Sequence, residues 1–336
     1  MYTLAIVGAT GAVGRQIIEV LEERQLPVKA LRLLASEKSV GEFIDFNDES
    51  LPVQQLDHDS FADIDIALFC ATDSISEQFC PVAAQAGAVC VDTSSFWRMD
   101  EAVPLVVPSV NAEDLSGFSG KRIVASPSAS AVQLSLALKV ISDCSPLVRV
   151  VVSTYQPVSG SGQRGIDELR KQCGELLNGR PTKNKVYPHQ VGFNCLPQVG
   201  DFNDDGYSDA EINLVHETAK LLNVHDLKMS VTAVRVPVFY GLSQSVNVET
   251  VGAVSVQKAR ELFDVMVAIE LVDNVSDGEY PMPVDASGQD LACVGRIRSD
   301  MSNDNALDMW VVADNLRQGA AINVVQIAEL LIQKYL

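Results

Sequence analysis

The first fourteen residues constrain this chain most, because an uncharged run from Thr3 to Val7 leads into three glycines and then a helical pattern. A run without charge is typical of a strand buried on both faces of a parallel sheet. Gly8, Gly11 and Gly14 follow at intervals of three residues. A backbone without Cβ atoms lets a pyrophosphate come close, and the free N–H groups of the helix attract it. We interpret the stretch as a dinucleotide-binding loop. The alternative is a tight turn without a ligand, for which one glycine would suffice.

Length and composition exclude several classes of protein. The chain has 336 residues, enough for two domains, and 47% apolar against 21% charged residues is typical of a soluble globular protein. The 44 acidic residues outnumber the 25 basic ones, which argues against a nucleic-acid partner. Neither a secretion signal nor a run long enough to span a membrane is visible, so we expect a cytoplasmic protein with no membrane partner.

The seven cysteines are odd in number and scattered, so they predict neither a disulfide framework nor a metal site. We expect reduced thiols that are mostly buried. They are Cys70, Cys80, Cys90, Cys144, Cys173, Cys195 and Cys293.

The first 127 residues predict a doubly wound α/β domain, because short apolar runs alternate with helical stretches. We expect a helix at Phe79–Ala86. The predicted strands that follow the first one are Leu31–Ala35, Ile64–Phe69, Ala88–Asp92 and Leu105–Val107.

The end of the second predicted strand bears on the choice of cofactor. An acidic residue there would bind the ribose of NAD, whereas basic and hydroxyl groups would hold the 2′-phosphate of NADP. Lys38 lies between Ser36 and Ser39, which favours NADP, although Glu37 is adjacent. A solvated turn is the alternative.

The pattern changes near Pro127, after which strands alternate polar and apolar residues, as expected of a sheet with one face on helices. We expect Gly319–Leu336 to form a long helix that packs on the first domain. The predicted strands are Val148–Thr154, Leu227–Val238 and Val246–Val251, and the predicted helices are Ile166–Asn178, Ala210–Leu222 and Val256–Phe263.

Seven segments, spread from one end of the chain to the other, resemble the motifs of the aspartate-β-semialdehyde dehydrogenase family in their order. They are Gly8–Gly14, Ser95–Arg98, Val107–Asn111, Thr154–Gly162, Phe193–Gln198, Arg235–Gly241 and Val312–Arg317. The resemblance implies an α/β fold with a Rossmann-like NADP-binding domain at 1–127, completed by a helix at 318–336. It also implies an α+β substrate-binding and dimerisation domain at 128–317 with a mixed sheet, and a homodimer. The family reduces β-aspartyl phosphate with NADPH to the semialdehyde and phosphate, in lysine, threonine and methionine biosynthesis.

The family's reaction requires a cysteine that attacks the acyl phosphate and forms a thioester, and a histidine that handles the proton. The matching positions here are Ala129 and Leu242. In the family's Glu-x-Lys segment, which binds substrate phosphate, Asn213 follows Glu211 in place of the lysine. The resemblance therefore implies that no catalytic residue is intact.

Other family positions are retained. The resemblance assigns Arg98, Glu211 and Arg235 to a small anionic ligand derived from an amino acid, and Gln156 to a supporting role. Asp73 replaces a glycine and brings negative charge to the place where cofactor phosphates lie. The cofactor residues that the sequence and the resemblance predict are Gly8, Thr10, Gly11, Ala12, Val13, Ser36, Lys38, Ser39 and Asn315.

Three hypotheses for function stay open. The first is a folded member that has lost its catalysis, like the Usg-type paralogues of this family that lack the cysteine. The second is an active NADP-dependent oxidoreductase that acts on aspartate semialdehyde or a related carbonyl without a thioester. The third is a nucleotide-sensing or subunit-pairing scaffold. We interpret Ser128 and Ser130 as capping residues, Cys195 as a packing residue and the four histidines as surface residues.

Overall fold

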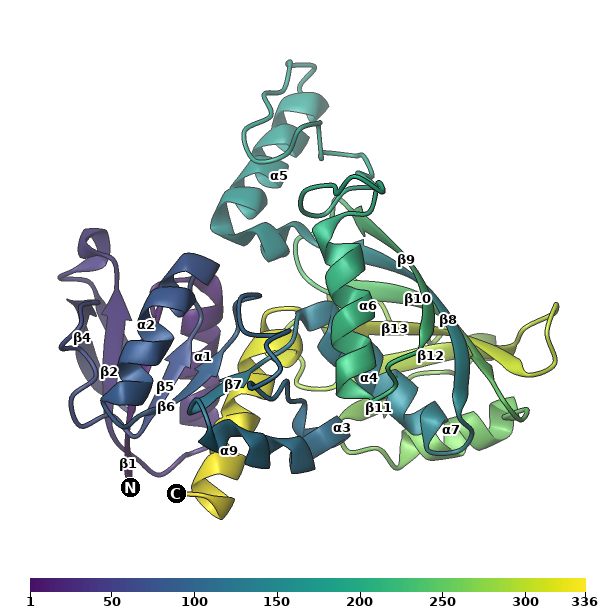
Figure 1. The fold of residues 1–336 in the computed structure, drawn as a ribbon. Coiled ribbons are helices and arrows are strands. Elements are labelled where there is room, and N and C mark those ends of the chain that lie inside the picture. The colour runs from purple at the N-terminus through teal and green to yellow at the C-terminus, as the bar shows by residue number, and fades with distance from the viewer. The chain divides into compact units, whose positions relative to one another are not determined.

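The structure is a computed structural model that describes every residue from Met1 to Leu336. The chain divides into two compact units. Unit 1 comprises Met1–Ser128 and Ala320–Leu336, and unit 2 comprises Ala129–Gly319. In Figure 1, unit 1 contains the purple and blue elements near the N-terminus and the yellow helix labelled α9. None of the helices has the length and apolar character needed to cross a membrane.

Unit 1 is organised around a seven-stranded sheet with the order β3-β4-β2-β1-β5-β6-β7. All neighbouring strands are parallel except β3 and β4, which form a hairpin. This topology confirms the predicted doubly wound α/β fold. The strands are β1 (Tyr2–Val7), β2 (Val28–Ala35), β3 (Phe43–Phe46), β4 (Glu49–Gln55), β5 (Ile66–Phe69), β6 (Val89–Asp92) and β7 (Ile123–Ala125).

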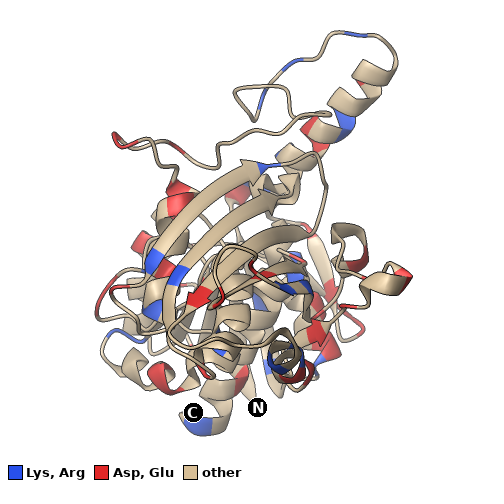
Figure 2. Cartoon of the chain, turned by 90° about the vertical axis from the view of Figure 1, so that its right-hand side faces the viewer, with Lys and Arg blue, Asp and Glu red and all other residues tan.

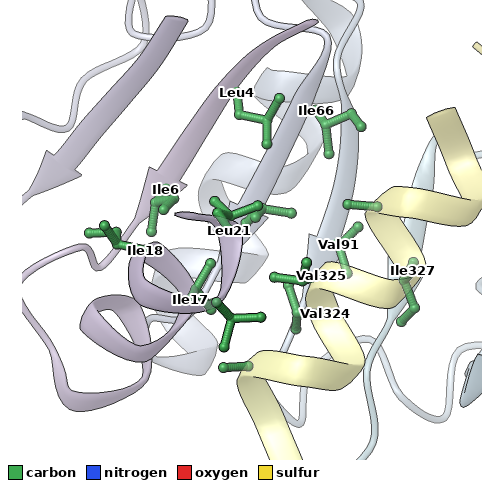
Figure 3. Close-up of a cluster of buried hydrophobic side chains, with 14 of the residues drawn as sticks. Leu4, Ile6, Ile17, Ile18, Leu21, Ile66, Val91, Val324, Val325 and Ile327 are labelled. Carbon is green, nitrogen blue, oxygen red and sulfur yellow. The ribbon is translucent and has the colours of Figure 1, made fainter. Parts of the chain in front are cut away.

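The core of unit 1 includes residues from both ends of the chain. Figure 3 shows Leu4 of β1, Ile17 of α1 and Val325 of α9 in one cluster, and all three are fully buried. Burying such apolar side chains is the main stabilising contribution to a fold of this kind. The last helix is therefore part of the core of unit 1. The helices of this unit are α1 (Ala12–Glu23), α2 (Asp73–Gln85), α3 (Pro108–Asn111) and α9 (Asn323–Lys334).

The predicted strand Leu105–Val107 is wrong. Leu105 makes only an isolated bridge with Ala125, and Val107 immediately precedes helix α3. Pro108 takes the first position of that helix, where its fixed φ angle suits a helical start. The buried apolar run is therefore a segment that leads into a helix.

The hairpin of β3 and β4 was not predicted, because most of its residues are polar or exposed and gave no clear alternation. Its tip consists of Asn47 and Asp48, with φ angles of 50° and 64°. Two successive left-handed residues of these types are typical of a tight hairpin turn.

The C-terminal helix is shorter than predicted. A π-type turn covers Arg317–Ile322, and the α-helix begins only at Asn323. The carboxylate of Asp314 accepts hydrogen bonds from the backbone N–H groups of Leu316 and Arg317. These bonds hold the preceding turn in a conformation that a regular helix would not allow.

Unit 2 contains a six-stranded mixed sheet with the order β11-β12-β13-β10-β8-β9. The pairs β8/β9 and β11/β12 are parallel, and the other three pairs are antiparallel. The mixed sheet confirms the predicted architecture. The strands are β8 (Leu147–Gln156), β9 (Lys228–Arg235), β10 (Leu242–Thr250), β11 (Ile269–Leu271), β12 (Ala292–Ser299) and β13 (Ala306–Ala313).

Helices cover one face of this sheet, as the alternation of its strands predicted. Along β8, Val150 and Val152 are buried, whereas Val151 and Ser153 on the opposite face are partly exposed. Figure 2 shows strands of this sheet with few charged positions along them. The helices of unit 2 are α4 (Ala129–Ser142), α5 (Gly162–Leu177), α6 (Asp209–Leu221), α7 (Val256–Asp264) and α8 (Pro283–Ala286).

The cysteines and histidines differ in how well their predicted environments agree with the structure. All seven cysteines are free, but only Cys80, Cys90 and Cys293 are buried, so the prediction of mostly buried thiols is wrong. Cys195 is exposed, which corrects its interpretation as a packing residue. All four histidines are exposed, as predicted.

Candidate functional site

The glycine loop between β1 and α1 has a geometry that other residues could not adopt. Gly8 has a φ of 92°, and a Cβ added there would lie 2.6 Å from the carbonyl oxygen of Cys70. A Cβ at Gly14 would lie 2.3 Å from the carbonyl oxygen of Gly8. Gly11 precedes α1 and donates its N–H to the carbonyl of Gly8 at 3.0 Å. The loop therefore provides the close-packed, Cβ-free backbone that a nucleotide phosphate requires.

The predicted cofactor residues of unit 1 cluster around this loop. The hydroxyl groups of Thr10 and Ser39 lie 3.2 Å apart, which joins the glycine loop to the turn after β2. Ser36 and Lys38 are exposed in that same turn. Ala12 and Val13 are partly exposed and form the start of helix α1, directly after Gly8, Thr10 and Gly11 of the loop.

Asp73 is the first residue of α2 and is exposed. Its carboxylate accepts hydrogen bonds from the backbone N–H of Ser95 at 2.9 Å and from the Ser95 hydroxyl at 2.5 Å. A carboxylate at this end of a helix is favoured by the helix dipole. Asp73 thus places fixed negative charge next to the strand end at Cys70.

Arg98 is held by backbone carbonyl groups. Its guanidinium donates to the carbonyl oxygen of Thr93 at 2.6 Å and to that of Ser126 at 3.2 Å. The nearby carboxyl of Asp92 has its pKa raised by burial, and hydrogen bonds from Ser76 and Ser94 and the charge of Arg98 oppose this shift. The result is an arginine fixed in one orientation beside a buried carboxyl group.

In unit 2, the first turn of α4 carries the position predicted for a nucleophile. Ala129 is the first residue of α4 and is partly exposed, and a Cβ on Gly319 would lie 2.5 Å from the Ala129 Cβ. Next to it, the Ser130 hydroxyl lies 3.5 Å from the amide nitrogen of Gln156, which also donates to Thr154 at 3.2 Å. The turn therefore places a methyl group beside a polar pair.

Leu242 is the first residue of β10 and is 3% exposed. It pairs with Ala313 of β13. The position that the resemblance assigns to a base is thus an apolar residue within the core, and it carries no group that could accept a proton.

Arg235 ends β9 and is buried, with 5% of its surface exposed. Its Nη1 donates to the carbonyl of Pro157 at 2.5 Å, and its guanidinium lies 6.0 Å from the ring centre of Tyr187. Burial lowers the pKa of this guanidinium, and no Asp or Glu pairs with it. Because a buried charge is costly unless it is paired, this arrangement suits an anionic ligand.

The remaining predicted residues of unit 2 have structural partners. Glu211 accepts hydrogen bonds from the backbone N–H of Ser208 at 2.7 Å and of Ala233 at 2.8 Å, so it forms a capping box and ties α6 to β9. Asn315 accepts a hydrogen bond from the Ser159 hydroxyl at 3.1 Å. Their roles toward a substrate and a cofactor stay predictions.

Sequence reasoning missed the side chains that hold the segment with Tyr187. The carboxylate of Glu168 accepts hydrogen bonds from the backbone of Lys185 and Val186, and the amide oxygen of Gln172 accepts from Val191 and Gly192. The spacing of four residues between two polar groups on an apolar helix face is a signal that could have identified them.

A glycine-loop nucleotide domain followed by a unit with a mixed sheet defines the class of two-domain, nucleotide-dependent dehydrogenases. Comparisons with known proteins agree. Residues 3–118 match a model described as the semialdehyde dehydrogenase NAD binding domain, and residues 138–318 match the semialdehyde dehydrogenase dimerisation domain. Unit 1 is therefore a nucleotide-binding domain.

The relatives are more specific. The chain is 47% identical to the aspartate-semialdehyde dehydrogenase of Aquifex aeolicus over 99% of this chain and 98% of that protein. It is 44% identical to aspartate-semialdehyde dehydrogenase 2 of Vibrio cholerae over the same shares. A crystal structure of aspartate semialdehyde dehydrogenase II from Vibrio cholerae covers 100% of both chains at a TM-score of 0.97 and 43% identity, and a second one was solved in complex with ASA. The chain belongs to the aspartate-semialdehyde dehydrogenase family.

Proposed function

We propose that this chain keeps the nucleotide-binding and ligand-binding architecture of its family but does not carry out covalent thioester chemistry. The observation that carries the proposal is Ala129 at the first position of α4. A methyl group cannot attack an acyl phosphate, whereas a thiolate at a helix N-terminus can. Loss of a covalent nucleophile lowers turnover on the order of 10⁶-fold in enzymes that form acyl intermediates.

No neighbouring group supports a substitute nucleophile. The Ser130 hydroxyl lies near the amide of Gln156, which is not a base, and Leu242 contributes no titratable group. Cys70 is partly exposed as a residue, but desolvation of its thiol and the charge of Asp92 raise its pKa to about 12. Burial raises the pKa of Cys293 to about 11, so both thiols are poor nucleophiles at neutral pH.

The retained arginines support binding of a small anionic, amino-acid-derived ligand. Arg235 is a buried cation without a carboxylate partner, which suits a ligand carboxylate. Arg98 is held by two carbonyl groups, and the family resemblance assigns it to a phosphate. Because a guanidinium binds a carboxylate or phosphate through paired hydrogen bonds, each arginine suits its assigned group.

We assign NADP as the nucleotide. Two observations support this assignment: Gly8 and Gly14 form a Cβ-free loop for phosphates, and Ser36, Lys38 and Ser39 offer hydroxyl and basic groups for a 2′-phosphate in the turn after β2. When bound, this cofactor supplies hydride chemistry. Asp73 would lower its affinity, because a carboxylate repels nearby phosphates.

A homodimer formed through unit 2 completes the proposal. The family model for residues 138–318 is described as a dimerisation domain, and Val151 and Ser153 of β8 are partly exposed on the sheet face opposite the buried Val150 and Val152. Sedimentation that gives a strictly monomeric mass would count against this assembly.

An active oxidoreductase without a thioester is the second candidate, because Arg235 still offers a site for a carboxylate beside Gln156 in the sheet. A scaffold that senses a nucleotide or pairs subunits is the third. Each predicts a different result in one experiment.

The experiment follows NADP⁺ reduction with aspartate semialdehyde and phosphate. It compares the parent with a triple variant, Ala129→Cys, Leu242→His and Asn213→Lys. The Gly319 backbone packs closely against Ala129, since a Cβ on Gly319 would lie 2.5 Å from the Ala129 Cβ, so the added sulfur must point away from Gly319. A matched control carries Ala129→Ser with the same two other changes, which restores bulk and the base without the thiol.

An inactive parent, an inactive serine control and an active cysteine variant would support the main proposal, in which the site keeps its binding architecture but lacks its nucleophile. An active parent would overturn the main proposal and favour the second candidate. If all three proteins are inactive while NADP⁺ still binds by calorimetry, the scaffold hypothesis gains support.

A further inference from the structure

Two neighbouring side chains of unit 2 each bury a polar atom that has no hydrogen-bond partner. The atoms are Nε of Arg235 and the hydroxyl oxygen of Tyr187. Buried polar groups in folded proteins are almost always paired, so an unpaired one requires an explanation. Neither of these two groups finds its acceptor within the chain.

Arg235 lies on the helix-covered face of the unit-2 sheet. Val231, Ala233 and Arg235 alternate along β9 and are all buried, and side chains two residues apart share one face of a strand. Val231 pairs with the buried Val152 of β8, whereas Ser153 on the opposite face is partly exposed. The Arg235 site is therefore on the other side of the sheet from the proposed homodimer contact.

The guanidinium of Arg235 is bound through only one of its nitrogens. Nη1 donates to the carbonyl oxygen of Pro157 at 2.5 Å, and a Cβ on Gly160 would lie 3.0 Å from this nitrogen. Nε and Nη2 make no hydrogen bond, and no carboxylate of the chain pairs with the group. Together these two nitrogens fit the two oxygen atoms of a ligand carboxylate.

Tyr187 is held in a fixed position beside this guanidinium. Its ring centre lies 6.0 Å from the guanidinium carbon of Arg235, within the range of a cation–π contact. The backbone N–H groups of residues 185–187 all donate to the buried carboxylate of Glu168. Further along the same segment, Leu196 exchanges two backbone hydrogen bonds with Arg235, at 2.9 and 2.8 Å. Both ends of the segment therefore fix Tyr187 relative to Arg235.

The hydroxyl of Tyr187 has its space from a glycine and its surroundings from an apolar cluster. A Cβ on Gly165 of α5 would lie 2.7 Å from the hydroxyl oxygen. The Tyr187 ring packs against the buried apolar cluster that includes Val158 and Leu169. An electrostatic interaction with Tyr187 opposes the lowering of the Arg235 pKa by burial. A buried hydroxyl without an acceptor is destabilising, so a ligand oxygen here would remove a cost of the free protein.

We propose that Tyr187 is a specificity-determining residue of the ligand site, and that its hydroxyl donates a hydrogen bond to the same carboxylate that pairs with Nε of Arg235. Both groups are donors in this arrangement, so an anionic oxygen satisfies them together, whereas an amide nitrogen would face two donors. The site therefore selects ligands with a free carboxylate. This inference rests on the proposed function, because it requires an amino-acid-derived anion at Arg235.

The test compares the parent with Tyr187→Phe by calorimetry with aspartate semialdehyde. We expect affinity to fall by about tenfold, the usual effect of losing a hydrogen bond to a charged group. The free energy of unfolding of the ligand-free variant should be unchanged or higher, because the lost hydroxyl has no partner. Tyr280→Phe makes the same change at a side chain that is 41% exposed, and should alter neither quantity.

A second probe separates recognition of the carboxylate from a general change in the site. 3-Aminopropanal is aspartate semialdehyde without its carboxylate, so it should bind the parent and Tyr187→Phe equally weakly.

Equal affinity of the parent and Tyr187→Phe for aspartate semialdehyde would overturn the inference and leave the proposed function intact. An equal loss of affinity for 3-aminopropanal, or a lower free energy of unfolding, would also overturn it, since the hydroxyl would then support the fold. A parent that does not bind aspartate semialdehyde at all would overturn the proposed ligand site, and the inference with it.

Discussion

The glycine loop of unit 1 and the first turn of α4 in unit 2 differ in what carries their chemistry. In the loop the backbone itself forms the site, and Gly8 and Gly14 are also required for packing against Cys70 and Ala9. In the α4 turn the chemistry would depend on one side chain, and Ala129 is a favourable helix residue. A site formed by backbone geometry cannot be lost without a cost in stability, whereas a single reactive side chain can.

We expect the largest effect on stability from a substitution in the glycine loop. Gly14→Val would place atoms 2.3 Å from the Gly8 carbonyl oxygen and 2.8 Å from the Ala9 Cα. We expect the free energy of unfolding to fall by about 3 kcal/mol, because the crowded atoms belong to the backbone and cannot move aside. Urea denaturation followed by circular dichroism measures this change.

Gly174 provides the control, since it lies in α5 and no atom is within 4 Å of an added Cβ. Gly174→Ala should raise the free energy of unfolding by about 0.5–1 kcal/mol. A Gly14→Val protein as stable as the parent would show that the loop is not coupled to packing.

The second prediction tests whether Glu211 stabilises the fold or binds the substrate. Glu211→Ala leaves two buried backbone N–H groups, those of Ser208 and Ala233, without an acceptor. We expect a loss of about 2 kcal/mol in the free energy of unfolding. Glu211→Gln, which keeps one oxygen acceptor, should lose less.

Calorimetry with aspartate semialdehyde completes this comparison. Because both carboxylate oxygens of Glu211 already have backbone donors, we expect little change in affinity for folded Glu211→Gln. Lost affinity with unchanged stability would instead assign Glu211 to the substrate.

The third prediction concerns the edge of the nucleotide site. Lys38→Glu should weaken NADP⁺ binding by about tenfold and NAD⁺ binding much less, because only NADP⁺ carries a 2′-phosphate. Lys29→Glu makes the same charge change at an exposed position of β2 and serves as the control. Equal losses for both nucleotides in Lys38→Glu would contradict NADP selection by this turn.

The same contrast explains what the sequence could predict. The glycines and the uncharged strand predicted the nucleotide domain, because close approach restricts which residues fit at Gly8 and Gly14. Alternation in strands such as β8 predicted a second sheet with one face on helices, whereas the family resemblance implied that this sheet is mixed. These signals are local, so they are readable in a single sequence.

Signals that depend on distant partners were missed or misread. Glu211 was expected to bind substrate, which stays a prediction, and its hydrogen bond to Ala233, 22 residues away, gave no local signal. Glu168 holds residues 17 and 18 positions away. Tyr187 gave no signal at all, because its contact with Arg235 depends on how distant segments of unit 2 pack. Such contacts are set by tertiary structure and not by local pattern.

The smallest expected effect tests the buried carboxyl of Asp92 beside Arg98. Burial raises its pKa above the ordinary 3.8, against hydrogen bonds from Ser76 and Ser94 and the charge of Arg98. The folded protein therefore binds this proton more tightly than the unfolded chain. The stability that protonated Asp92 contributes is fully present below pH 3.8 and is lost as the pH rises through the raised pKa.

The Asp92→Asn variant tests this, because its side chain stays neutral. Its free energy of unfolding relative to the parent should increase between pH 3.8 and the raised pKa and then stay constant. Urea denaturation at a series of pH values measures the difference, and Asp204→Asn at an exposed position is the control. A difference that does not vary with pH would show that burial is not what governs this carboxyl, and that Arg98 compensates its charge in full.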